Sequence, residues 1–98
     1  MEVRYSGTVT TPPTFFSSRR HHRTHEQFDV RADDGSTFRV IDNVSIAPRV
    51  PARPGDRVTV QGELVHDRGQ PPIVHWTHHD PGRRHVDGFV ELGGRIYA

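Results

Sequence analysis

Histidine is concentrated in one short stretch near the C-terminal end of the sequence. Four of the eight histidines lie between residues 75 and 85, together with the dipeptide Asp80-Pro81. A carboxylate beside imidazoles can orient one of them as a general base, and several such groups can bind a divalent metal. Protonated imidazoles and the adjacent Arg83 and Arg84 can instead hold phosphate directly. The stretch therefore indicates acid–base, metal or phosphate chemistry.

Strand periodicity predicts which way these side chains point. If Val74 and Trp76 face the core, then His75 and Thr77 face outward, beside outward residues of the neighbouring strand. His78 follows where that strand ends. The candidate catalytic residues are His25, His75, His78 and Asp80. The candidate ligands of a zinc or magnesium ion are His75, His78, Asp80 and His85. The alternative is a polar loop in which Asp80 caps the backbone and the imidazoles are solvated.

A second basic cluster precedes the second expected strand and reads Arg19-Arg20-His21-His22-Arg23-Thr24-His25. In an OB barrel the loop between the first two strands borders the ligand face. We therefore expect a basic rim that contacts a phosphate backbone, formed by Arg19, Arg20, Arg23, Arg83 and Arg84. A solvated charge run is the alternative. All 13 basic residues are arginines, which is typical of GC-rich genomes and also suits bidentate phosphate binding.

Length and composition limit the possibilities. The 98 residues allow a single domain, 1–98, and the absence of cysteine excludes disulfides and cysteine-ligated zinc. No run of roughly 18 apolar residues is present, so no membrane partner is expected. The first residues do not resemble a signal peptide. We therefore expect a cytoplasmic protein, or an exported one if a leader has been removed.

Short alternating runs separated by glycine and proline predict an all-β domain. The expected strands are 3–9, 25–32, 37–41, 57–66 and 72–77, followed by a hairpin of 88–92 and 95–97. Long loops are expected over 11–24 and 78–87, and a single helical turn capped by Asn43 after the third strand. Five strands with this irregular crossing favour a small five-stranded OB-like barrel with a C-terminal hairpin. A β-sandwich is the main alternative.

The string Val74-His75-Trp76-Thr77-His78-His79-Asp80-Pro81, followed by His85 and Gly88, resembles the hallmark of a bacterial family catalogued as domain of unknown function 3465. Further matches include His25-Glu26-Gln27-Phe28 and the segment 43–49. The resemblance implies an OB-like β-barrel, with relatives that look exported, and it implies no established activity. The sequence departs from the family at Asp42, where histidine is usual, and at Phe89, where tryptophan is usual. The first departure weakens any metal site that uses a histidine at position 42.

These observations leave three functional hypotheses open. The first is a module that binds single-stranded DNA or RNA, with nucleic acid as its partner. The second is a small histidine-dependent nuclease or phosphoester hydrolase, with or without a metal. The third is a metal-binding or protein-interaction domain without catalysis. The oligomeric state does not follow from the sequence.

Overall fold

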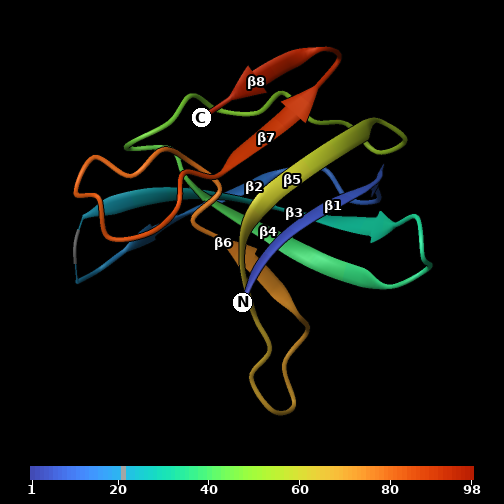
Figure 1. The fold of residues 1–98 in the computed structure, drawn as a ribbon, viewed down its shortest axis with the longest axis horizontal. Helices are drawn as coiled ribbons and strands as arrows, with labels where there is room; N and C mark the ends of the chain where they lie inside the picture. Colours follow the sequence, from blue (N-terminus) through green and yellow to red (C-terminus); the bar gives the residue numbers. More distant parts are fainter. Residues whose placement is uncertain (21) are drawn as a thin grey trace.

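The computed structural model describes residues 1–20 and 22–98, so His21 of the basic cluster lies outside the described residues. The described chain forms strands joined by turns and loops (Figure 1). The strands are β1 (Glu2–Val9), β2 (Thr14–Ser18), β3 (Arg23–Ala32), β4 (Thr37–Asn43), β5 (Arg57–Val65), β6 (Ile73–His75), β7 (Phe89–Leu92) and β8 (Arg95–Tyr97).

Five of these strands close into a barrel. They follow the order β1-β3-β4-β6-β5, and β1 pairs with β5 to complete the ring. The β4–β6 pair is parallel, whereas the other pairs are antiparallel. The sequence-based prediction of an OB-like barrel is therefore confirmed. The predicted C-terminal hairpin is also confirmed, because β7 pairs with β5 and with β8 and lies beside β5 in Figure 1.

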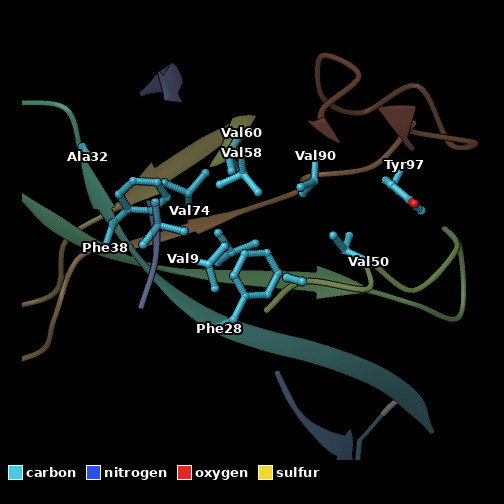
Figure 2. Packing of buried hydrophobic residues seen from close by; sticks show 13 residues of the cluster. Val9, Phe28, Ala32, Phe38, Val50, Val58, Val60, Val74, Val90 and Tyr97 are labelled. Atoms are coloured by element: carbon cyan, nitrogen blue, oxygen red, sulfur yellow. The ribbon is translucent and has the colours of Figure 1, made fainter. Parts of the chain in front are cut away.

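Alternation along the strands builds the core. In β5, Val58 and Val60 are buried while Thr59 and Gln61 are partly exposed, which is the pattern of a strand with one face inward. Figure 2 shows these valines packed with residues from across the barrel, including Phe28 of β3. Each fully buried valine or phenylalanine contributes roughly 1.5–3 kcal/mol. The closed ring also hides the edges of the five barrel strands, which small all-β domains must protect.

The prediction of a long loop over 11–24 is wrong. Residues Thr14–Ser18 form β2, which pairs in register with the first half of β3, and β3 itself begins at Arg23. Thr14, Phe15 and Phe16 are residue types that favour a strand, although Pro12-Pro13 and the arginines suggested a loop. Phe16 stacks on His25 with ring centroids 5.2 Å apart. This contact holds β2 against β3, which is itself a strand of the barrel.

The predicted fifth strand, 72–77, is also wrong at its end. It stops at His75 because Trp76 has a φ of 55°, a conformation that is rare for a bulky residue. Trp76 is 42% exposed rather than in the core, and Thr77 is buried rather than outward. The left-handed backbone at Trp76 thus reverses the alternation from which the orientations of Trp76 and Thr77 were predicted.

The third predicted strand is too short. β4 continues through Asn43, so Asp42 is a buried strand residue and not part of a loop. The predicted turn follows directly, with the Asn43 side-chain oxygen accepting a hydrogen bond from Ser45 N at 3.0 Å. Ala47 N donates to the Asn43 carbonyl, also at 3.0 Å. The chain then returns to β5 through an extended connection.

Candidate functional site

A pocket of about 260 Å³ lies on the outer face of the barrel sheet. Three neighbouring strands supply one wall, because His25 of β3 is in register with Asn43 of β4, and β4 runs beside β6, which ends at His75. The segment 76–88 supplies most of the remaining side chains. The full lining is His25, Ile41, Asn43, Ile46, His75, Trp76, His78, Asp80 and His85. The pocket thus brings together every predicted catalytic residue and every predicted metal ligand.

An aromatic stack forms part of this pocket. The Trp76 indole stacks with the His75 imidazole and with the His85 imidazole, each at 4.6 Å between centroids and within 20° of parallel. His78 meets His85 edge-on at 5.3 Å. The strained backbone of Trp76 is what puts its ring among the imidazoles. Strain of this kind is usually kept where the surrounding structure over-determines it, often at functional sites.

Two imidazoles have their orientation and tautomer set by the backbone. His78 Nδ1 lies 2.5 Å from the His79 carbonyl oxygen, and His85 Nδ1 lies 2.8 Å from that of Val86. A carbonyl only accepts, so Nδ1 is the protonated nitrogen that donates in both rings. Each neutral ring therefore keeps a lone pair on Nε2. These nitrogens can act as a base, a metal ligand or a hydrogen-bond acceptor.

Asp80 organises the loop that carries these histidines. Its carboxylate accepts backbone N–H groups from Gly82 at 2.9 Å, from His85 at 2.6 Å and from Arg84. Burial works to raise the pKa of Asp80, but these donors outweigh it and hold the pKa below its ordinary value. The nearest approach of its carboxylate to His85 Nε2 is 3.9 Å, too long for a hydrogen bond. The backbone-capping alternative therefore describes this residue better than an imidazole-orienting role.

Burial makes the pocket imidazoles weak bases. It lowers the pKa of His25, His75 and His78 below the usual 6.5, because desolvation disfavours the charged ring. At His75 the Glu63 carboxylate, its register partner on β5, works in the opposite direction. These three rings are therefore neutral at pH 7.

The donor set can be compared with the two predicted metals. Magnesium takes oxygen ligands, and the Asp80 oxygens already accept three backbone N–H groups, so this site does not fit it. Zinc accepts imidazole nitrogen. Across residues 1–20 and 22–98, however, no three His, Asp or Glu side chains are grouped closely enough to hold a metal ion. Zinc binding stays a prediction.

None of the five arginines of the predicted basic rim lines the pocket. Arg23 is two residues before His25 on β3 and so shares its outward face, and Arg19 and Arg20 lie in the turn between β2 and β3. Arg84 lines a neighbouring pocket beside Trp76 and His85, and Arg83 precedes it. All five arginines are exposed. Where the structure describes the chain, none of them forms an ion pair.

Sequence reasoning missed a buried polar group on the opposite face of the same sheet. Glu26 and Asp42 are register partners with 1% and 0% exposure, and Thr77 is equally buried. Glu26 accepts the Val50 N–H at 2.8 Å. The Asp42 oxygens and the Thr77 hydroxyl have no hydrogen bond of ordinary geometry to described residues. An inward carboxylate could have been read from alternation, since Glu26 precedes the inward Phe28 by two residues.

Burial raises the pKa of Asp42 to about 7. The nearby Thr77 hydroxyl favours the charged form, while the Glu26 carboxylate disfavours it further. Burial also raises the pKa of Glu26. Glu26 and Asp42, inside the barrel, therefore bind protons more tightly than carboxyl groups in water do.

The strand order and the imidazole-lined pocket define a small OB-type barrel with a candidate site on the outer face of its sheet. The family described as protein of unknown function (DUF3465) matches residues 3–98, and the chain belongs to this family. No curated protein matches the chain. No helix among the described residues is long and apolar enough to cross a membrane.

Proposed function

We propose that this protein binds single-stranded nucleic acid across the outer face of β3, β4 and β6. The observation that carries the proposal is the position of the histidine pocket on this face of a barrel with the strand order of an OB fold. OB folds use the corresponding surface for oligonucleotides and oligosaccharides. The exposed, unpaired arginines at the pocket rim favour the oligonucleotide, because arginine binds phosphate through a planar fork.

The pocket volume limits what enters it. About 260 Å³ lies below the roughly 300–1,000 Å³ of sites for drug-sized ligands. The pocket therefore encloses one unit of the strand, while the rest of the strand follows the rim. Binding therefore combines one enclosed unit with several phosphate contacts outside it.

The test is binding of short single- and double-stranded DNA and RNA, measured by the anisotropy of a labelled oligonucleotide. We expect single strands to bind more tightly than duplexes, since a paired base cannot enter the pocket. The same incubations, run with and without a chelator, are analysed for cleavage. Lack of binding to every oligonucleotide at low salt would remove the proposal.

A second candidate is a histidine-dependent phosphoester hydrolase, favoured by the free Nε2 lone pairs of His78 and His85. A neutral imidazole near a phosphodiester can remove a proton from an attacking hydroxyl or water, and a second imidazole in its protonated form can give a proton to the leaving oxygen. Under this candidate, His78→Ala abolishes cleavage while the thermal unfolding curve keeps its cooperativity. Equal product formation by wild type and His78→Ala would end this candidate without affecting the binding proposal.

A further inference from the structure

The pocket and its rim differ in charge, so they suit different parts of a nucleotide, the base and the phosphate. None of the nine lining residues is an arginine, and the one carboxylate, Asp80, is occupied by backbone N–H groups. The cationic side chains lie outside, at Arg23, Arg83 and Arg84. A phosphate gains most from the rim, whereas an uncharged ring loses least on entering the pocket. If the proposed function holds, the enclosed unit is therefore the base.

The walls of the pocket suit a planar ring. Ile41 and Ile46 contribute apolar surface, and the stacked rings of His75, Trp76 and His85 contribute aromatic surface. Bases of single strands are commonly held in this way, stacked on aromatic side chains and read along their hydrogen-bonding edges. The apolar surface and the stack provide affinity without distinguishing the four bases.

The Nε2 atoms of the pocket histidines can distinguish one base from another. The Nε2 atoms of His78 and His85 are acceptors, because Nδ1 of each ring donates to a main-chain carbonyl. Their rings meet edge-on, with centroids 5.3 Å apart and planes 78° apart. Acceptors on two neighbouring rings can each take one donor from a ligand that carries two. Among the bases, guanine alone has two neighbouring donors on its pairing edge, N1–H and the N2 amino group, whereas thymine and uracil have a single N–H between two carbonyls.

We infer that the histidine pocket is a guanine site, in which the Nε2 atoms of His78 and His85 accept the N1–H and N2–H donors of one unpaired base. The inference rests on the proposed function and adds a sequence preference to it. Guanine in a strand otherwise made of thymine then acts as the anchor nucleotide. Flanking phosphates occupy the arginine rim.

The test compares heptadeoxynucleotides that differ only at the central base. TTTGTTT is expected to bind about 5- to 150-fold more tightly than TTTTTTT, the range for a good bidentate contact to a base. Inosine lacks the N2 amino group, so TTTITTT is expected to lie between them. Adenine and cytosine, each with one amino donor, are expected to bind more weakly than guanine.

Matched variants assign the preference to the imidazoles. His78→Phe keeps a ring but removes the acceptor, and is expected to abolish the difference between TTTGTTT and TTTTTTT. His79→Phe is the control, because His79 is exposed and does not line the pocket; it is expected to keep the difference. His85→Phe provides a second acceptor deletion if the first variant unfolds, as judged by circular dichroism.

The outcomes separate the inference from the function on which it rests. Equal affinity for all heptamers, or a preference for another base, overturns the guanine site and leaves nucleic-acid binding intact. A guanine preference that survives both His78→Phe and His85→Phe in folded protein also overturns it. Failure of every heptamer to bind overturns the proposed function itself.

Discussion

At the scale of single residues, Trp76 and Asp42 decide how the site is built. Trp76 adopts a left-handed conformation, which places its ring among imidazoles and turns Thr77 into the barrel. Asp42 lies on the inner side of the strand whose next residue, Asn43, lines the pocket. The buried carboxyl groups and the candidate site therefore lie on opposite faces of β4, separated only by the backbone of that strand.

Asp42 is expected to make the barrel less stable as the pH rises. Its pKa is about 7 in the folded protein against an ordinary 3.8, so the folded state binds the proton more tightly over that interval. Stability is therefore greatest below pH 3.8 as far as this group is concerned, and the contribution, on the order of 4 kcal/mol, is lost as the pH rises through 7.

The variant Asp42→Asn tests this, because the amide is neutral at every pH. We expect its melting temperature at pH 8 to exceed that of wild type by at least about 5 °C, and the difference to shrink toward pH 5. Thermal unfolding of both proteins across this range isolates Asp42, since the histidines titrate equally in each. A difference that does not change with pH would contradict the assignment.

The imidazole stack makes Trp76 fluorescence sensitive to pH. Trp76 is the only tryptophan, and a protonated imidazole in contact with it quenches its emission. Because burial lowers the pKa of His75, we expect the quenching due to His75 to have its midpoint below pH 6.5. The His75→Gln variant supplies the reference, and the difference between the two titrations belongs to His75. Identical titrations for the two proteins would show that the rings do not stack in solution.

At the scale of elements, the segment 76–88 lies against the barrel because two glycines allow it. A Cβ on Gly62 would meet the His75 carbonyl and the Val74 side chain, and one on Gly88 would overlap main-chain atoms of Trp76, Thr77 and Gln61. Gly88 N also donates to the His78 carbonyl at 2.9 Å. The loop that carries the candidate site is therefore packed on strand backbone and held by its own hydrogen bonds.

Gly88→Ala is expected to destabilise the protein by about 1–3 kcal/mol or more, the usual cost of overpacking, since the obstructing atoms are backbone. Gly82→Ala is the matched control in the same segment, because its Cβ would approach no atom closer than 3.4 Å. Urea unfolding measures both variants. Equal midpoints for the two would contradict the close approach at Gly88.

Most of the strands could be predicted from the sequence, and the errors in the prediction have physical causes. Alternation in residues such as Val58 and Val60 predicted the strands, their inward faces and the barrel order, because strand period is a local property. The end of β6 could not be predicted, since the left-handed conformation of Trp76 is imposed by tertiary packing. β2 was missed because neighbouring prolines and arginines obscured a five-residue strand that is stabilised by pairing with β3.

The sequence predicted which residues form the candidate site, but not what each of them does. Clustering of His75, His78 and His85 in the chain, with His25 on an adjacent strand, was enough to place them in one pocket. The role of Asp80 was not evident, because its backbone partners depend on how the loop closes. The Nε2 acceptors depend in the same way on carbonyl positions that no sequence pattern indicates.

At the scale of the whole molecule, the formal charge of +1 conceals an uneven distribution. Arg39 and Arg57 are paired with Asp29 and Asp33, whereas the rim arginines are free of such pairs among the described residues. Arg4, Arg31, Arg49, Arg53, Arg68 and Arg95 also form no ion pair among the described residues, so unpaired arginines are not confined to the rim. The contribution of the rim to binding a polyanion is therefore measured against that of an arginine elsewhere on the surface.

Binding to single strands is accordingly expected to weaken with salt. Five arginine contacts give a slope of log K against log salt of up to about −3.5, at roughly −0.7 per phosphate neutralised. Arg84→Ala is expected to reduce the slope by about 0.7, and Arg53→Ala, an exposed arginine outside the rim, to leave it unchanged. Anisotropy titrations at several salt concentrations give the slopes. A slope near zero would contradict a phosphate-binding rim.

The two faces of the sheet around β4 impose opposite demands on the surrounding medium. Acid charges the imidazoles on the outside and removes the lone pairs that would contact a ligand, while alkali ionises the carboxyl on the inside and loosens the fold. The proposed binding is therefore expected to be strongest from mildly acidic to neutral pH. The imidazoles outside the sheet set the acid limit of this range, and Asp42 inside it sets the alkaline limit.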